Sequence, residues 1–414
     1  MKPVADQMKW ANALSTRPSL EGAVLEVVER SQQLLSAPAD LGFVFISSAF
    51  ASEYSRLMPL LQEQLGVPVL IGCSGSGIIG MDSQLAAREL EEEQPALSLT
   101  LACLPGVQVE AFHLDGEELP DLDSPPDAWV EAIGVPASSH PHFVILADPF
   151  TSKINDLLQG LDFAYPGSAK VGGLASGGAM GNTIGLFSGD RLYREGAVGV
   201  ALSGNIVLET IVAQGCKPIG HPFTVKECER NILLALDDGP CGSGVSQRPL
   251  EALKTVIEHL SESDRQLAQH SLFIGIARNE FKDELEQGDF LIRNVLGVDP
   301  REGAIAIGDR LRPGQRIQFH LRDAQTSAED LEMLLQRYQS RFSASNSSIG
   351  ALMFACLGRG EQLYDQPDFD SHLFRQYVGN IPVSGFFCNG EIGPVGGGTF
   401  LHGYTSVFGI CHPL

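Results

Sequence analysis

The sequence is poor in charged residues, and in basic residues above all. Charged side chains make up 19% of the 414 residues, below the quarter that is usual for globular proteins, whereas 43% of the residues are hydrophobic. This composition argues against a largely disordered chain. Only 28 Lys and Arg stand against 51 Asp and Glu, which gives a net charge of −23. Because so negative a surface repels phosphate groups, the shortage disfavours nucleic-acid binding through a broad basic face.

Long hydrophobic runs and paired cysteines are also missing. No stretch approaches the roughly 18 uninterrupted apolar residues of a membrane-spanning helix, and the start, Met1–Asp6, has no apolar run typical of a secretory signal. None of the eight cysteines forms a Cys-x-x-Cys pair, which argues against a zinc module or a disulfide framework. We therefore expect a cytoplasmic protein with reduced thiols and without membrane insertion.

A strand–helix–strand pattern that ends in small residues occurs three times in the chain. Each copy starts with a short apolar run, continues with a helical pattern, and returns to an apolar run followed by Gly, Ser, Cys or Asn. The three copies cover residues 43–46, 52–65 and 67–77; residues 143–146, 152–161 and 169–178; and residues 351–356, 369–378 and 381–390. Their glycine-rich segments would leave equivalent strand ends, where ligands of such sheets usually bind.

The remaining patterns indicate the fold class and two domains. Residues 8–36 predict a helix, and strand-rich stretches such as 97–112 predict hairpins. We expect a mixed α/β fold, with layered mixed β-sheets flanked by helices and two tightly associated domains. A loop of glycine and small residues over 237–249 marks the boundary. The predicted domains are residues 20–238 and residues 248–414.

The quoted segments resemble a known family. Phe143 to Gly178 and the strands after it resemble the FIST N-terminal domain, and Phe290 to His412 resembles the FIST C-terminal domain. The marks of the second are Phe354–Gly360, Val383–Pro394 and a terminal strand around Thr405. The resemblance implies a sensory module that binds a small ligand, with amino acids suggested as ligands. Because the chain leaves no room for an output domain, it is similar to stand-alone FIST proteins, which would report to a separate signalling protein.

The candidate ligand site combines two charged side chains with glycine-rich loops. Arg359 follows a predicted strand and could bind a carboxylate, and Glu391 follows another and could bind an ammonium group. The two would suit a zwitterionic amino acid, or they could form an internal ion pair without a ligand. Glu391 could also be a solvated residue of a tight turn. The other predicted ligand-binding residues are Cys73, Ser74, Cys356, Gly358, Cys388, Asn389, Gly390, His402 and Tyr404.

Other functions remain open at this point. A hydrolase or transferase could use Cys73, Cys356 or Cys388 as a nucleophile, with His402 or His372 as its base. A scaffold without a ligand would fill the loops with its own side chains. Residues 75–80 fit the G-x-G-x-x-G pattern, but a short following segment without the expected acidic residue disfavours a dinucleotide. We expect neither a cofactor nor a metal, since the histidines show no ligand spacing.

Overall fold

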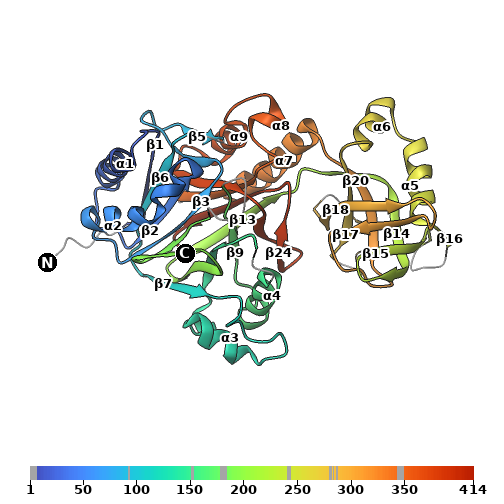
Figure 1. Ribbon diagram of the computed structural model, residues 1–414, viewed down its shortest axis with the longest axis horizontal. Coiled ribbons are helices and arrows are strands. Elements are labelled where there is room, and N and C mark those ends of the chain that lie inside the picture. Colours follow the sequence, from blue (N-terminus) through green and yellow to red (C-terminus); the bar gives the residue numbers. More distant parts are fainter. Residues whose placement is uncertain are drawn as a thin grey trace. The chain divides into compact units, whose positions relative to one another are not determined.

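The computed structural model describes residues 7–91, 94–150, 153–177, 184–239, 244–278, 282, 284–285, 288–342 and 349–414. It has two compact units. The first comprises residues 1–212 and 332–414, and the second comprises residues 213–331 (Figure 1). The residues of each unit contact one another more than they contact the other unit. The predicted division into domains of residues 20–238 and 248–414 is a different one, and it stays a prediction. Among the described residues, no helix has the length and apolar character needed to cross a membrane.

The first unit is built from three repeats of six strands each. The first repeat has β1 (Lys9–Ser15), β2 (Leu41–Ser47), β3 (Val69–Gly75), β4 (Ile78–Met81), β5 (Ala87–Leu90) and β6 (Leu97–Cys103). The second has β7 (Val107–Leu114), β8 (His142–Ala147), β9 (Lys170–Leu174), β10 (Leu186–Ser188), β11 (Arg191–Tyr193) and β12 (Ala197–Gly204). The third has β13 (Val207–Ala213), β21 (Gly350–Cys356), β22 (Val383–Cys388), β23 (Glu391–Val395), β24 (Gly398–His402) and β25 (Ser406–His412). The repeat predicted from the sequence is therefore confirmed.

The repeats exchange hairpins in a cycle. The strand orders of the three sheets are β1-β6-β2-β3-β10-β11, β7-β12-β8-β9-β23-β24 and β13-β25-β21-β22-β4-β5. In each sheet the second and third strands of a repeat form a central parallel pair. The last two strands come from a different repeat. The first sheet thus takes its edge hairpin from the second repeat, the second sheet from the third, and the third sheet from the first.

Each central pair brings a glycine against the backbone of the neighbouring strand. The register pairs are Gly72 with Val44, Gly172 with Ile145, and Gly385 with Met353. A Cβ added at any of these glycines would lie less than 3.0 Å from the partner's carbonyl group, a distance that real Cβ atoms do not show. The glycines therefore occupy equivalent positions in the three repeats, and each allows the close approach of two strands.

Helices connect the strands at equivalent places. One group joins the first strand of each repeat to the second: α1 (Leu20–Leu35), α3 (Pro126–Ile133) and α7 (Ala324–Phe342). Another joins the second to the third: α2 (Tyr54–Gln64), α4 (Ile154–Ala164), and α8 (Glu361–Tyr364) with α9 (Phe369–Val378). The 3₁₀ helices are η1 (Ser48–Glu53) and η2 (Ala137–Ser139). The mixed α/β fold with mixed sheets and flanking helices is confirmed.

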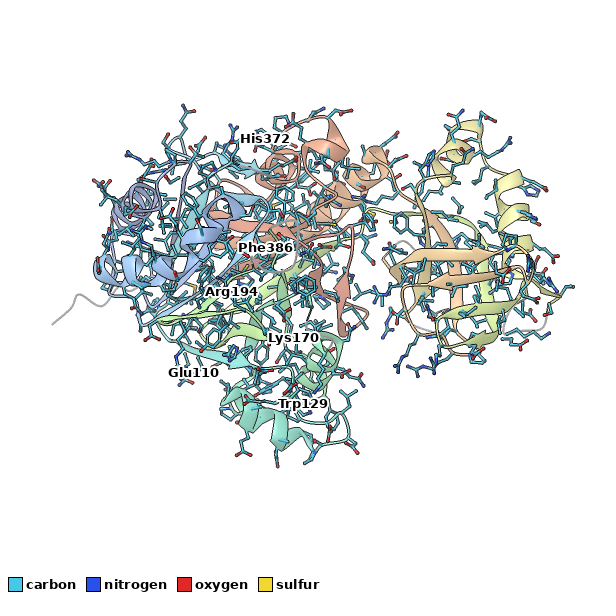
Figure 2. The ribbon with its side chains drawn as sticks, viewed as in Figure 1. Glu110, Trp129, Lys170, Arg194, His372 and Phe386 are labelled. Atoms are coloured by element: carbon cyan, nitrogen blue, oxygen red, sulfur yellow. The ribbon has the colours of Figure 1, made fainter. Side chains whose placement is uncertain are left out.

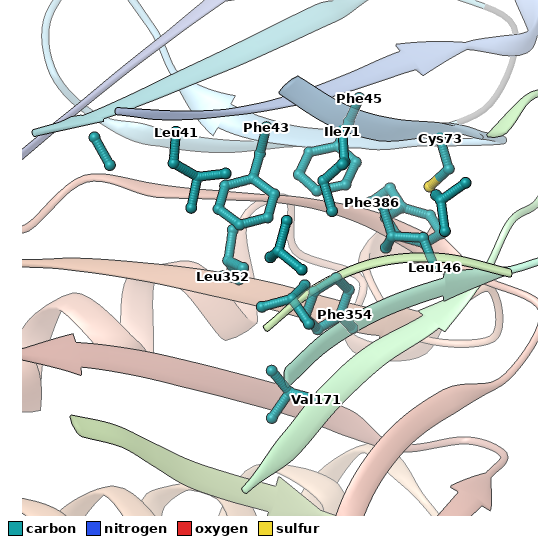
Figure 3. Packing of buried hydrophobic residues seen from close by; sticks show 14 of the residues in the cluster. Leu41, Phe43, Phe45, Ile71, Cys73, Leu146, Val171, Leu352, Phe354 and Phe386 are labelled. Atoms are coloured by element: carbon teal, nitrogen blue, oxygen red, sulfur yellow. The ribbon is translucent and has the colours of Figure 1, made fainter. Parts of the chain in front are cut away.

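The three sheets share one hydrophobic core. Alternate residues of β2 show how it forms, since Phe43 and Phe45 point into the common core while Val44 and Ile46 point to α1 and α2. From the third sheet, Phe386 stacks against Phe45, and Phe354 packs edge-on against Phe386 (Figure 3). The other residues drawn there come from all three sheets and include Leu41, Ile71, Cys73, Leu146, Val171 and Leu352. The strands that carry the loops of all three repeats are therefore packed against one common core.

A buried lysine fastens the exchanged hairpin of the third repeat. Lys170 at the start of β9 is 1% exposed, and its ammonium group lies 2.9 Å from a carboxylate oxygen of Asp162 on α4 (Figure 2). The same carboxylate accepts hydrogen bonds from the backbone N–H and the hydroxyl of Thr399 on β24, at 2.6 and 2.7 Å. Although burial lowers the pKa of Lys170, its bonds to Asp162 oppose that shift. The second and third repeats are joined here by charge as well as by strand pairing.

The second unit is a closed antiparallel barrel inserted between β13 and α7. Its strands are β14 (Lys217–Glu229), β15 (Ile232–Asp237), β16 (Ser246–Gln247), β17 (Leu272–Ala277), β18 (Phe290–Asp299), β19 (Ala304–Ile307) and β20 (Arg316–Leu321). They follow the order β14-β20-β17-β18-β19-β15-β16, and pairing of β14 with β15 closes the ring. The unit also contains α5 (Pro249–Glu258) and α6 (Glu262–Ala268). Apolar side chains such as Phe223, Ile274 and Phe319 fill its interior.

One element was predicted wrongly from the sequence. Residues 9–15 form the strand β1 rather than the start of a helix, and they pair with β6 along their whole length. Every residue of β1 after Lys9 is buried, so the strand lacks the polar–apolar alternation that usually marks a sheet. The helix begins only after Pro18, where the Ser19 hydroxyl accepts a hydrogen bond from the Gly22 N–H.

Candidate functional site

The three strand-end loops meet in the first unit. Near the end of the third strand of each repeat, a backbone N–H donates to a loop carbonyl of another repeat. These bonds run from Ser74 N to Gly185 O at 2.8 Å, from Leu174 N to Gly390 O at 2.8 Å, and from Phe387 N to Gly77 O at 3.0 Å. The prediction that the glycine-rich loops leave equivalent strand ends is therefore confirmed for the described residues; Gly178 lies outside them.

Ser176 forms hydrogen bonds with residues of the loops from both other repeats. The predicted list of site residues did not include it. Its buried hydroxyl accepts from the Ser76 N–H at 2.8 Å and donates to the Phe387 carbonyl. Its own carbonyl accepts from the Ser74 hydroxyl at 3.0 Å. Aligning the three repeats places Ser76, Ser176 and Asn389 at one position, each followed by glycine. That alignment is the sequence signal that could have identified Ser176.

Arg359 is fully buried in an ion pair with Asp370. Its Nε lies 2.7 Å from one carboxylate oxygen of Asp370, and its Nη2 lies 3.0 Å from the other. Asp370 is the second residue of α9. Nη2 also donates to the Tyr364 hydroxyl at 2.5 Å. Nη1 also lies 3.4 Å from the carbonyl oxygen of Tyr404. The predicted role of Arg359 in binding a carboxylate stays a prediction, but this guanidinium already carries a bidentate partner.

Glu391 reaches the other side of the same peptide bond. This carboxylate is fully buried, and its Oε2 accepts from the Thr405 N–H at 3.1 Å. The carbonyl of Tyr404 and the N–H of Thr405 belong to one peptide unit, so Arg359 and Glu391 hold its two ends. Tyr404 has a φ of +63°, which is rare for a residue with a side chain. The two side chains thus hold a strained turn between β24 and β25.

Burial divides the eleven predicted site residues into two groups. The buried ones are Cys73, Ser74, Arg359, Cys388, Gly390, Glu391 and His402. The partly or fully exposed ones are Cys356, Gly358, Asn389 and Tyr404. Three members of the second group lie near the Tyr404–Thr405 peptide: a Cβ on Gly358 would lie 3.6 Å from the Tyr404 ring, and the Cys356 N–H donates to the Thr405 carbonyl at 2.9 Å. Only this second group offers atoms that a ligand could contact without rearrangement.

Backbone carbonyls hold both Asn389 and His402. The exposed Asn389 donates its side-chain amide to Ala175 O at 3.1 Å, and its backbone N–H to Leu174 O at 3.1 Å. His402 lies opposite Glu391 in the β23–β24 register, and its Nε2 is 3.0 Å from Gly393 O. Asn389 can therefore present polar atoms at the surface, whereas His402 is turned into the structure.

Two of the candidate cysteines have the wrong environment for a nucleophile. Burial raises the pKa of the Cys73 and Cys388 thiols well above the usual range, and the nearby Glu391 raises that of Cys388 further. A nucleophilic cysteine needs a lowered pKa and access to its substrate. Cys356, which lies next to Cys388 in the parallel register, is partly exposed. Of these three candidate cysteines, Cys356 is therefore the one with access to a substrate. The second candidate base, His372, lies exposed on α9 (Figure 2).

The segment that fits G-x-G-x-x-G leads into a strand. Residues 78–81 form β4, which pairs with β22 and β5. A dinucleotide-binding segment would instead open a helix whose N-terminus faces the pyrophosphate. The glycines serve close contacts here, because a Cβ on Gly80 would lie 2.6 Å from the Ser98 hydroxyl.

A second buried carboxylate, Glu89 on β5, lies behind Asp370. Glu89 is 6% exposed and accepts from the Ser371 N–H at 2.6 Å, and its own N–H donates to Asp368 at 2.6 Å. Asp368 in turn pairs with Arg88 at 3.1 Å. Burial, followed by the charge of Asp370, raises the pKa of Glu89 to about 8. The carboxyl group is therefore protonated in the folded protein at neutral pH.

This protonation predicts a pH-dependent stability that Glu89→Gln removes. Between about pH 5 and pH 8, Glu89 is ionised in the unfolded chain and neutral in the folded one, so the free energy of unfolding falls as the pH rises, by at most about 1.4 kcal/mol per pH unit. Denaturant titrations across this range should show the advantage of Glu89→Gln over wild type growing with pH. The exposed Glu118→Gln is the control and should run parallel to wild type. A constant difference for Glu89→Gln would contradict the assignment.

Comparison with known protein families finds two domain models in succession along the chain. The FIST N domain model matches residues 40–239, and the FIST C domain model matches residues 249–394. An uncharacterized protein of Mycobacterium tuberculosis is 32% identical over 401 residues, which is 96% of this chain and 98% of the relative. An F-box/LRR-repeat protein of Arabidopsis thaliana is 21% identical over 98% of this chain and 86% of its own length.

A solved structure of cyanuric acid hydrolase from A. caulinodans also aligns with the chain. The alignment covers 97% of this chain and 99% of the hydrolase, with 10% identity and a TM-score of 0.31. Values this low carry no argument about fold or activity.

Proposed function

Because the chain belongs to the FIST family, with a FIST N domain followed by a FIST C domain, we propose that it is a sensor that binds a small polar metabolite such as an amino acid. FIST domains are linked to signal transduction and ligand sensing. The proposal places the ligand on the exposed group of Cys356, Gly358, Asn389 and Tyr404. Binding would be reported to a separate signalling protein. Seven free cysteines among the described residues support a reducing compartment, and hence a cytoplasmic location.

One observation carries the proposal: the strained turn at Tyr404 is held from both sides by the buried Arg359 and Glu391, and its ring lies beside the partly exposed Gly358. Strained, over-determined backbone concentrates at binding sites, where it preorganises the contact atoms. Gly358 is partly exposed beside the Tyr404 ring, and the exposed Asn389 amide adds polar atoms. In this arrangement Arg359 and Glu391 shape the site through the peptide bond between them.

The test is a melting-temperature screen of the twenty amino acids with wild type and Gly358→Ala. A ligand at 100 times its Kd stabilises the folded state by about 2.7 kcal/mol, which a melting curve resolves. A Cβ on Gly358 meets the Tyr404 ring at ordinary contact distance, so Gly358→Ala should fold normally and yet block the approach of a ligand to the backbone. We expect its affinity to fall about tenfold or more.

Gly66→Ala is the matched control, since a Cβ there meets no atom within 4 Å. It should bind as wild type does. If no amino acid shifts the melting temperature of wild type, the proposed ligand class is wrong. If a hit binds Gly358→Ala as tightly as wild type, the ligand lies elsewhere on the protein.

A further inference from the structure

A single ion pair joins helix α9 to the turn at Tyr404. Asp370 at the start of α9 holds Arg359 through two charge-assisted hydrogen bonds, and both side chains are fully buried. A bidentate pair of this kind fixes the plane of the guanidinium as well as its position. The orientation of Arg359 is therefore set from α9, and the Tyr364 hydroxyl supports it.

The other end of this arginine touches a peptide bond that needs support. Nη1 lies 3.4 Å from the Tyr404 carbonyl, and the adjoining Thr405 N–H donates to Glu391. A non-glycine residue at a φ of +63° costs about 1–3 kcal/mol and persists only where its surroundings enforce it. On the carbonyl side of this peptide, Arg359 is a contact that can help to enforce it.

We propose that Asp370 is a positioning residue of the ligand site: acting through Arg359, it holds the Tyr404–Thr405 peptide in its strained conformation and couples that site to α9. That a ligand binds at this site rests on the proposed function, whereas the coupling of Asp370 to the Tyr404–Thr405 peptide does not. A change at Tyr404 must move Arg359, and a moved Arg359 must pull on the first turn of α9. Ligand binding at the site and the position of α9 are then thermodynamically coupled, so a change in one shifts the other.

Amide hydrogen exchange tests the coupling without any ligand. In wild type, the Thr405 amide should be protected, because it donates to a buried carboxylate. In Asp370→Asn, which keeps the size of the side chain and removes its charge, exchange at the Thr405 amide should speed up about tenfold or more. Asp370→Glu keeps the charge and should restore most of the protection. Amides of β1 and β6, in another sheet, should exchange as in wild type.

Two further variants keep the test decisive. Asp365→Asn removes an exposed acid five positions away and should leave the exchange of Thr405 unchanged. Tyr364→Phe removes one hydrogen bond to Arg359 without altering charge, so it should accelerate the exchange in the same direction by a smaller factor even if Asp370→Asn does not fold.

Failure of this inference differs from failure of the proposed function. If Asp370→Asn or Tyr364→Phe leaves the Thr405 amide as protected as wild type, Asp370 only stabilises α9 and the coupling is wrong. If the exchange responds as expected but no amino acid binds, the coupling holds and the ligand class is wrong.

Discussion

Replacing Arg359 by methionine is expected to lower the free energy of unfolding by about 3–5 kcal/mol. The substitution leaves the Asp370 carboxylate buried without its bidentate partner, and an uncompensated charge in an apolar interior is far more costly than the pair itself. Denaturant titration followed by tryptophan fluorescence measures the change well. Both tryptophans of the chain, Trp10 and Trp129, are buried in the first unit, so the signal reports on the unit that contains the pair.

The double variant Arg359→Met with Asp370→Leu separates charge from packing. Removing both charges should recover most of the lost stability, because no isolated ion remains buried. If Arg359→Met costs less than about 1 kcal/mol, the pair is solvated and the burial described above is wrong.

Gly385→Ala is expected to prevent the first unit from folding. The new methyl group would lie 2.7 Å from the carbonyl carbon of Met353 and still closer to its oxygen, so β21 and β22 would have to separate. Two adjacent central strands cannot give way without breaking their parallel ladder, and a loss beyond about 4 kcal/mol follows. Soluble yield and tryptophan fluorescence of the variant measure the effect.

The equivalent changes Gly72→Ala and Gly172→Ala should be about as damaging, since both face a partner carbonyl in the same way. Gly66→Ala, with open space around its Cβ, should change stability by less than about 0.5 kcal/mol. A folded Gly385→Ala with near wild-type stability would contradict the register of the central pair.

Local patterns in the sequence were enough to find the repeats and the family. The apolar runs at Phe43, Phe143 and Ala351 and the small residues that follow are short-range signals, and each became a strand with a loop. The hairpin exchange could not be predicted, because β4 pairs with β22, about three hundred residues later in the chain. Nothing local to β4 specifies which repeat it joins.

The sequence motifs indicated residues of the candidate site, but not the contacts between them. The motifs indicated Arg359, Glu391 and Tyr404, but not that Arg359 and Glu391 would grip one peptide bond between them. Asp370 lies only eleven residues after Arg359, yet charged residues at a helix start are usually solvated, and no pattern marks this one as buried. Burial of a charge is decided by tertiary packing, which the sequence pattern does not contain.

The exchange of hairpins has a consequence for synthesis on the ribosome. The second sheet has its own strands by residue 204, but its edge hairpin, β23 with β24, comes from residues 391–402. Conversely β4 and β5, made among the first hundred residues, wait for β22. Early strands therefore emerge with unpaired edges that only the last part of the chain can cover. A chain cut short before residue 391 would therefore lack the edge hairpin of its second sheet, and that sheet edge would stay open to pairing with other chains.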